Sequence, residues 1–146
     1  MQRILVTGAS GFVGSRFVER WRNEFEILAP SHAELDITDA VSVERYIIEH
    51  APQVVLHLAA LSNTWYCEQH PDESYHVNVE GVCNLAAAAA RNGVKFVFFS
   101  SDQVYNGNYE SGALSEEVAV APETVYGRHK LEAEQRALEL CPTAVA

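Results

Sequence analysis

The stretch that decides the fold is Thr7 to Gly14, TGASGFVG, in which Gly8, Gly11 and Gly14 are spaced as GxxGxxG. A short apolar run precedes this stretch, and residues with helical periodicity follow it. A strand, a glycine turn and a helix in this order let a pyrophosphate approach the backbone, because a side chain would clash there and the helix N-terminus is positive. We therefore predict a dinucleotide-binding turn, whose alternative is a glycine turn without a ligand.

Working outward from this turn, strand-like apolar runs alternate with helical stretches along the whole chain. The predicted strands are 3–7, 26–29, 53–60 and 95–100. The first predicted helix follows the glycine turn and ends near residue 23, and the other predicted helices span 39–50, 73–91 and 124–140. This alternation indicates an α/β fold of Rossmann-like type, with three αβα layers around a parallel, doubly wound sheet. Residues 143–146 look like the start of another strand, so we expect one domain over 1–146 that is truncated at its C-terminus.

The composition excludes several classes of protein. The chain has 146 residues, 48% of them hydrophobic, and a formal net charge of −10. It therefore has enough apolar material for a core, and its averaged field repels nucleic acid and anionic membrane surfaces. No segment resembles a signal peptide or a membrane span, so we expect a cytoplasmic protein that binds neither nucleic acid nor a membrane. The three cysteines are odd in number and lack a CxxC, which predicts reduced, buried thiols.

The end of the second predicted strand bears on the choice of cofactor. A carboxylate there would hold the adenosine ribose hydroxyls and favour NAD(H) over NADP(H). Here the sequence reads Ala29-Pro30-Ser31-His32 and carries no carboxylate. Arg16 and His32 are candidate neighbours of a 2′-phosphate, and Asp36 follows later, where an Asx turn or a helix cap is its alternative role. NADP(H) is therefore permitted, and use of NAD(H) is equally open.

A candidate catalytic set lies in the second half of the chain. Tyr126 and Lys130 are four residues apart at the start of a predicted helix, so both side chains project from one face. A neighbouring ammonium lowers the pKa of a phenol, which makes it a better proton donor and acceptor. Ser101 ends a predicted strand, where parallel sheets bind ligands, and its hydroxyl could hold a substrate carbonyl. The alternative is a surface pair of side chains on a helix.

Five segments together carry a family resemblance: TGASGFVG, LDITD, VVLHLAA, FFSSDQVYNG and VYGRHKLEAE. Their order and spacing resemble those of the extended short-chain dehydrogenase/reductases, and among these most closely the dTDP-4-dehydrorhamnose reductases. The resemblance covers the whole chain but only the amino-terminal half of such a protein, so the substrate-binding C-terminal part is expected to be absent. The departures are Ser31, where such reductases often have an acid, and Gln103.

The resemblance implies roles for particular residues. The implied NAD(P)(H)-binding residues fall in three groups, which lie at the pyrophosphate, at the adenine and beneath the cofactor. They are, in this order, Gly8, Gly11, Phe12, Val13 and Gly14; Asp36 and Ile37; and Ala59, Ala60 and Leu61. Ser101 and Asp102 would meet the sugar of a nucleotide-sugar substrate. Tyr126 would donate the proton in the reduction of a 4-keto-6-deoxy sugar, and Lys130 would also bind the nicotinamide ribose. The sugar is expected to lie under the loop 105–125.

Two alternatives to a reductase stay open. Sugar-nucleotide epimerases and dehydratases share the glycine turn, the serine and the Tyr-Lys pair. A non-catalytic regulatory subunit resembling the β subunit of methionine adenosyltransferase shares the fold and several motifs. An exposed sheet edge at the end of the chain also suggests a homodimer.

Some polar residues are given structural roles. Cys67 and His70 form CxxH without a second pair, and no histidine completes a ligand set, so no metal site is predicted. His57 lies within a predicted central strand and is expected to be a hydrogen-bonded core residue. Asn78 is expected to hydrogen-bond to neighbouring backbone and not to substrate.

Overall fold

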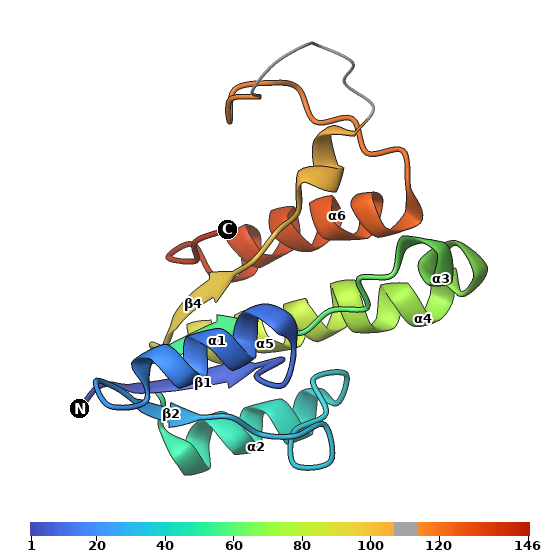
Figure 1. The fold of residues 1–146 in the computed structure, drawn as a ribbon. Coiled ribbons are helices and arrows are strands. Elements are labelled where there is room, and N and C mark those ends of the chain that lie inside the picture. Colours follow the sequence, from blue (N-terminus) through green and yellow to red (C-terminus); the bar gives the residue numbers. More distant parts are fainter. Residues whose placement is uncertain (107–113) are drawn as a thin grey trace.

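The computed structural model describes residues 1–106 and 114–146. Its sheet consists of β1 (Arg3–Thr7), β2 (Glu26–Leu28), β3 (Val54–His57) and β4 (Lys95–Phe98), all parallel and in the order β2-β1-β3-β4 (Figure 1). The strand order reverses between β1 and β3, because β2 lies on one side of β1 and the later strands lie on the other. The predicted α/β class and parallel, doubly wound sheet are confirmed.

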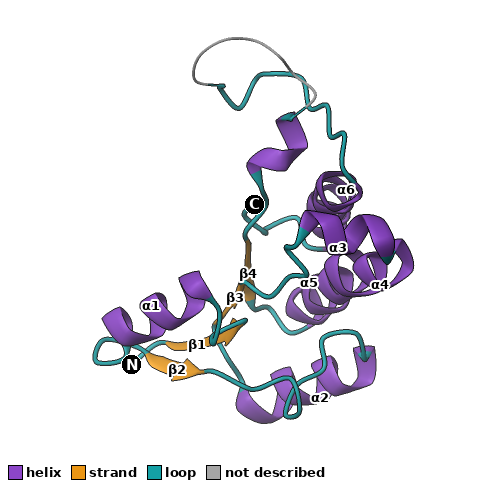
Figure 2. Ribbon diagram, turned by 45° about the vertical axis from the view of Figure 1, so that its right-hand side comes forward, coloured by secondary structure: helices purple, strands orange, loops and turns teal. Residues whose placement is uncertain are grey.

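Helices connect the strands and cover both faces of the sheet. They are α1 (Phe12–Trp21), α2 (Ala40–His50), α3 (Thr64–Gln69), α4 (Pro71–Tyr75), the π-helical η1 (His76–Glu80), α5 (Gly81–Arg91), the 3-10 helical η2 (Asp102–Tyr105) and α6 (Val125–Leu140). Figure 2 shows α1 on one side of the sheet, with α2, α5 and α6 on the other. The molecule is thus a three-layer αβα sandwich within its described part.

The core divides along the two faces of the sheet, as alternation of side chains along a strand requires. The larger cluster joins Leu5, Val55 and Phe96 to residues of α2, α5 and α6. The smaller cluster is built on Ile4, Val6 and Leu56, against which Phe17 of α1 packs. Since β1 and β3 are buried from both sides, the carboxyl ends of these strands are held rigidly.

Local polar side chains fix where the helices begin. Asp39 caps α2 by accepting a 2.9 Å hydrogen bond from the Val41 N–H, and Asn63 caps α3 in the same way through Tyr66. Thr124 accepts a 2.9 Å bond from the Gly127 N–H and so starts α6. Such caps satisfy N–H groups that have no partner inside the helix.

Several predicted boundaries were wrong. The third strand ends at His57 and not at Ala60, because the chain then passes close to Gly8. The predicted helix over 73–91 begins at Pro71 and changes to π-helical geometry at 76–80, and α3 was not predicted. The start of a further strand, expected at 143–146, is present as one parallel bridge between Val97 and Val145. The early end of β3 arises from a contact between distant segments, which periodicity does not contain.

The three cysteines are free and buried, as predicted. Among residues 1–106 and 114–146, no helix is both long enough and apolar enough to cross a bilayer. The same residues contain no group of three or more His, Cys, Asp or Glu side chains that could hold a metal ion.

Candidate dinucleotide and catalytic site

Of the three glycines in the turn, two leave no room for a side chain within the fold, and the third faces open space. Gly8 has φ of 72°, and a Cβ there would lie 2.6 Å from the Ala59 nitrogen. A Cβ on Gly14 would lie 2.2 Å from the Gly8 oxygen, whereas one on Gly11 would meet only that oxygen, at 3.2 Å. Gly8 and Gly14 are therefore required by internal packing. Gly11, by contrast, leaves space in front of the backbone.

The open space at Gly11 adjoins the N-terminus of α1. Gly11 is the N-cap of this helix, and it offers no side chain to its first N–H groups. Such groups, together with the positive end of the helix dipole, bind phosphate. The turn therefore has the geometry that a dinucleotide pyrophosphate requires.

A groove runs past this turn in two adjoining parts. The adenosine part, so named for the ligand portion it would hold, has a volume of about 400 Å³ and reaches Asp36. The catalytic part has a volume of about 460 Å³ and reaches Tyr126 and Lys130. Both parts are lined by Gly8, Ser10, Ala59 and Ala60, so they share a wall at the glycine turn.

The structure brings most of the predicted residues to this groove. Asp36, Ile37 and Leu61 line the adenosine part, and Gly11, Phe12, Val13 and Gly14 line the catalytic part. Ser101 and Asp102 line neither part. Ser101 nevertheless lies close enough to Tyr126 to act on the pKa of its phenol. Residues 107–113 of the loop predicted to cover the sugar lie outside the described residues.

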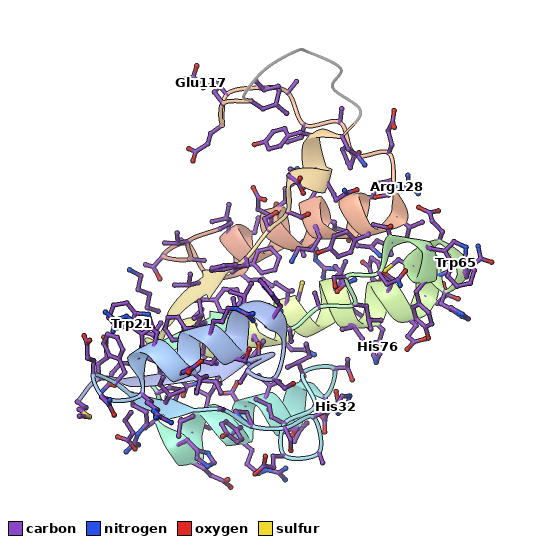
Figure 3. All side chains as sticks on the ribbon, in the orientation of Figure 1. Trp21, His32, Trp65, His76, Glu117 and Arg128 are labelled. Carbon is purple, nitrogen blue, oxygen red and sulfur yellow. The ribbon has the colours of Figure 1, made fainter. Side chains whose placement is uncertain are left out.

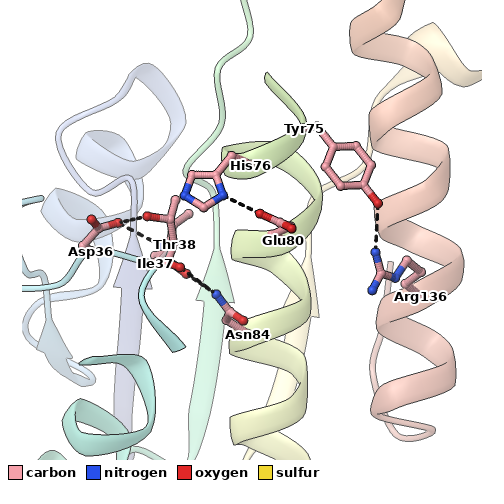
Figure 4. A network of polar contacts seen from close by, with 8 residues as sticks. All are labelled: Asp36, Ile37, Thr38, Tyr75, His76, Glu80, Asn84 and Arg136. Carbon is pink, nitrogen blue, oxygen red and sulfur yellow. Dashed lines mark hydrogen bonds and ion pairs between the residues drawn. The ribbon is translucent and has the colours of Figure 1, made fainter. Parts of the chain in front are cut away.

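Asp36 is held by a local turn at the adenosine part. Its Oδ1 accepts hydrogen bonds from the Thr38 N–H at 2.9 Å and from the Thr38 hydroxyl at 2.7 Å, which lower the pKa of the carboxyl. Asn84 of α5 donates a 3.0 Å bond to the Ile37 oxygen (Figure 4). Of the two alternatives, Asp36 thus forms the Asx turn, and Asp39 is the helix cap.

Residues 29–32 after β2 carry no carboxylate, as the sequence indicates, but the carboxylate of Glu34 lies close to Ser31 and lines a separate depression. The Glu34 side chain turns back and accepts hydrogen bonds from the N–H and the hydroxyl of Ser31, at 2.8 and 2.7 Å. His32 lines the adenosine part, as a neighbour of the cofactor should. Arg16 lines neither part, because its guanidinium bonds to the Phe12 oxygen and lies 3.7 Å from the centre of the Phe12 ring.

At the other end, α6 presents Tyr126 and Lys130 to the groove. Lys130 is only 4% exposed; its Nζ donates a 2.5 Å bond to the Phe99 oxygen and lies 4.1 Å from the centre of the Phe98 ring. Burial lowers the pKa of Lys130 to about 8. The ammonium is therefore poised at the carboxyl end of β4, where it can face a ligand.

The pKa of Tyr126 departs from the prediction. We expected Lys130 to lower the pKa of Tyr126, but burial raises it, and the interaction with Ser101 opposes this shift only in part. The cause is that burial dominates while the Lys130 ammonium is bonded to Phe99. The phenol is therefore protonated at neutral pH, which is the form that a proton donor needs.

Sequence reasoning missed several polar groups of the site. Ser10, Ser62 and Ser100 line the catalytic part, and the buried Ser100 hydroxyl has no hydrogen-bond partner among the described residues. The motif FFSSD contained the signal for Ser100, since it places two serines in succession at the strand end.

His57 and Asn78 each hydrogen-bond to a residue that lines the adenosine part of the groove, namely Thr7 and Leu61. The His57 ring is 1% exposed and its Nδ1 lies 2.6 Å from the Thr7 hydroxyl, so it is the predicted core residue, although its Nε2 has no partner among the described residues. Asn78 accepts a 2.9 Å bond from the Leu61 N–H and donates a 3.0 Å bond to the Leu61 oxygen. The prediction that Asn78 bonds to backbone is confirmed.

Comparison with known proteins gives the same family as the motifs. Residues 1–146 match the family model described as RmlD substrate binding domain. The chain is 35% identical over 147 residues to dTDP-4-dehydrorhamnose reductase of Aggregatibacter actinomycetemcomitans, covering 99% of this chain and 50% of the relative. It is 31% identical over 146 residues to the bovine methionine adenosyltransferase 2 subunit beta, covering 94% of this chain and 43% of the relative.

Solved structures agree with this assignment. The crystal structure of a dTDP-4-dehydrorhamnose reductase from Clostridium acetobutylicum matches with a TM-score of 0.94 at 33% identity, over 98% of this chain and 51% of that one. The Bacillus anthracis reductase in complex with NADP has a TM-score of 0.92 at 31% identity, over 99% and 52%. The structure of a UDP-glucose 4-epimerase from Thermotoga maritima matches with a TM-score of 0.85 at 26% identity, over 95% of this chain and 51% of that one.

The chain spans about half the length of the curated relatives it matches. Almost the whole chain, including the glycine turn and the Tyr126-Lys130 pair of α6, superimposes on the reductase from Clostridium acetobutylicum. We conclude that the chain belongs to the family described as RmlD substrate binding domain.

Proposed function

We propose that residues 1–146 form the NAD(P)(H)-binding domain of a reductase that acts on a 4-keto-6-deoxy sugar nucleotide. The observation that carries this proposal is the groove: it runs from Asp36, past the open N-terminus of α1, to Tyr126 and Lys130. A dinucleotide needs these three elements in this order, since its adenosine, pyrophosphate and nicotinamide lie along one line. The similar reductase from Bacillus anthracis, solved with NADP, supports the same assignment.

In this proposal the residues of the chain perform three tasks. The first turn of α1 would bind the pyrophosphate, and Lys130 would orient the nicotinamide ribose. A reduced dinucleotide held in this way would supply the hydride that reaches the carbonyl carbon of the sugar. Tyr126, which burial keeps protonated, donates its hydroxyl proton to the oxygen of that carbonyl.

Ser101 and Asp102 are proposed to hold the sugar beside Tyr126. The Ser101 hydroxyl accepts a 3.2 Å bond from the Gln103 N–H, which orients it at the start of η2, and it lies close enough to Tyr126 to lower the pKa of the phenol. A substrate carbonyl bound by both hydroxyls would be polarised where negative charge develops.

The test has two steps. Purified residues 1–146 are titrated with NADPH and NADH, following energy transfer from Trp21 and Trp65 to the reduced nicotinamide, with calorimetry as a check. These tryptophans lie at opposite ends of the molecule, so each samples a different part of it (Figure 3). Saturable binding supports the dinucleotide site; absence of binding of both cofactors by both methods contradicts it.

The second step uses the full-length protein and a 4-keto-6-deoxy sugar nucleotide. Tyr126→Phe should abolish turnover and leave dinucleotide affinity within about threefold, because general acid catalysis contributes about 100-fold or more to a rate. Tyr46→Phe, a change on α2 outside the groove, is the matched control and should keep full activity. Wild-type turnover by Tyr126→Phe would remove Tyr126 from its assigned role.

A second candidate function is that of a non-catalytic regulatory subunit, which the 31% identity with the bovine methionine adenosyltransferase 2 subunit beta favours. Dinucleotide binding without turnover of any keto-sugar nucleotide by the full-length protein would support it. An epimerase or dehydratase would instead return the cofactor to its starting redox state or release water. The cytoplasmic location and the homodimer stay predictions.

A further inference from the structure

The first turn of α6, which carries Tyr126, is held by a side chain from another helix. The N–H of Val125, the first residue of α6, donates a 2.6 Å hydrogen bond to Oε1 of Glu68 on α3. The two helices lie side by side at this end of α6 (Figures 1 and 2). The proposed function assigns no task to Glu68, so the question is what this bond does for the groove.

Two side chains satisfy the start of α6 between them. The first N–H groups of a helix have no partner inside it, and here the Arg128 N–H is the first to bond within the helix, to the Thr124 oxygen at 2.9 Å. Thr124 accepts from the Gly127 N–H through its hydroxyl, and Glu68 accepts from the Val125 N–H. A carboxylate at this position is also attracted by the positive end of the helix dipole. Loss of Glu68 would therefore fray the first turn of α6.

Glu68 can act in this way because α3 is itself fixed to the body of the molecule. The neighbouring Cys67 is fully buried, and its thiol donates a 3.2 Å hydrogen bond to the oxygen of Leu61. Asn63 caps α3 by accepting a 2.9 Å bond from the Tyr66 N–H. The carboxylate of Glu68 is thus presented to α6 from an anchored helix, although the residue itself is exposed.

Tyr126 and Lys130 depend on this bond to different degrees. Tyr126 directly follows Val125 on the first turn, so its position follows the start of the helix. Lys130 lies one turn later, where its Nζ is held by the Phe99 oxygen and lies 4.1 Å from the centre of the Phe98 ring. Fraying of the first turn would therefore displace the phenol and leave the ammonium in place.

The effect of Glu68 concerns the position of the phenol and not its charge. Burial raises the pKa of Tyr126, and the described residues that also shift it are Ser101, Cys67 and Asp102. Glu68 is likewise absent from the described residues that line the two parts of the groove. Its side chain therefore acts on the reaction only through α6.

We propose that Glu68 is a positioning residue, which holds the first turn of α6 so that the Tyr126 hydroxyl stays at the catalytic part of the groove. This inference rests on the proposed function, since it requires Tyr126 to donate a proton to the substrate. A small displacement of a reacting group lowers a rate strongly, because the reacting atoms must meet within a narrow range of distance and angle.

The experiment uses the full-length protein as the wild type and as Glu68→Ala, Glu68→Gln and Gln69→Ala. Glutamine keeps an oxygen for the Val125 N–H and removes the charge. Gln69 is the exposed neighbour of Glu68 on α3, so its variant controls for a general disturbance of this helix. Three quantities are measured: kcat for reduction of a 4-keto-6-deoxy sugar nucleotide, the affinities of NADPH and NADH, and amide hydrogen exchange along α6. Circular dichroism checks that all four proteins are folded.

We expect Glu68→Ala to lower kcat about tenfold or more and to change dinucleotide affinity by less than about threefold. Amide exchange should become faster at 125–127 and stay unchanged in the second half of α6, as local fraying requires. Glu68→Gln should keep kcat within about threefold of the wild type, and Gln69→Ala should behave as the wild type. A general loss of stability would instead lower kcat and cofactor binding together.

Three outcomes would overturn the inference: wild-type kcat in Glu68→Ala, an equal loss of kcat and dinucleotide affinity, or a Glu68→Gln protein as impaired as Glu68→Ala. Each would show that the bond to Val125 does not position Tyr126, while leaving the proposed reaction intact. A wild-type protein that binds dinucleotide but reduces no keto-sugar nucleotide would instead overturn the proposed function, and this inference with it.

Discussion

The Lys130 ammonium donates a 2.5 Å hydrogen bond to the backbone oxygen of Phe99, the residue that follows β4. This bond ties α6 to the end of the strand from which Ser101 follows. The ammonium is almost fully buried, which lowers its pKa to about 8. Lys130 is therefore held in place for a ligand at a cost to the stability of the folded chain, as is common at functional sites.

That cost predicts how stability depends on pH. The unfolded amine keeps its ordinary pKa of 10.5, so between about pH 8 and 10.5 the unfolded chain binds more protons than the folded one, and stability rises with pH. Lys130→Met removes the buried charge and should raise the free energy of unfolding at pH 7 by up to about 3 kcal/mol. It should also weaken dinucleotide binding.

Urea unfolding of the wild type and of Lys130→Met from pH 7 to 10.5 checks this expectation. The difference between their free energies of unfolding should shrink to near zero at about pH 10.5. Lys95→Met, which changes an exposed residue of β4, serves as the control. A Lys130→Met protein that is less stable than the wild type at pH 7 would contradict the argument.

The glycine turn predicts opposite results for two alanine substitutions. Gly11→Ala should change the free energy of unfolding by less than about 1 kcal/mol, because its Cβ meets only one atom, at 3.2 Å. Its dinucleotide affinity should nevertheless fall about tenfold or more, since the methyl group occupies the space of the pyrophosphate. Gly14→Ala should lose about 3 kcal/mol of stability, because its Cβ would lie 2.2 Å from the Gly8 oxygen. Thermal unfolding measures the stability of the two variants, and cofactor titration measures their dinucleotide affinity. An equal loss of stability in Gly11→Ala and Gly14→Ala would contradict this expectation.

His57 predicts a second pH dependence, on the acid side. Burial and the nearby Lys130 lower its pKa to about 3, so between about pH 3 and 6.5 the unfolded chain binds more protons and stability falls as the pH falls. His57→Gln should reduce this slope by about 1.4 kcal/mol per pH unit near pH 5. Denaturant unfolding at pH 4 to 7 gives the slopes, and a slope that His57→Gln leaves unchanged would show that other groups cause it.

Asn78 predicts a coupling between the π-helical turn and the groove. Asn78→Ala breaks both bonds to Leu61 and leaves the part-buried Leu61 N–H without its partner, while the Leu61 oxygen keeps the Cys67 thiol as a donor. It should therefore lose about 1 to 3 kcal/mol of stability. Because Leu61 lines the adenosine part, cofactor affinity should fall as well. Asn78→Asp keeps the acceptor for the Leu61 N–H and should lose less of both. Asn92→Ala, at the end of α5, is the control and should leave affinity unchanged.

Sequence reasoning succeeded where the signal is local. The order of strand, glycine turn and helix at Thr7 to Gly14 was correct, as was the parallel sheet that alternation implies. The Ser31-Glu34 pair was missed, although its spacing of S-x-x-E is itself a local signal for reciprocal hydrogen bonding. The helix α3 was also missed, because six residues are too few to display helical periodicity.

The sequence by itself determined which residues can form a dinucleotide turn, because glycine conformation, helix capping and periodicity depend on neighbours along the chain. Only the tertiary structure decided that Lys130 lies at the groove that begins at Gly8, more than a hundred residues earlier. It also decided the direction of the Tyr126 pKa shift. The reason is physical: burial and through-space contacts depend on segments that meet only when the sheet assembles, and they set the charge states of the groups that meet there.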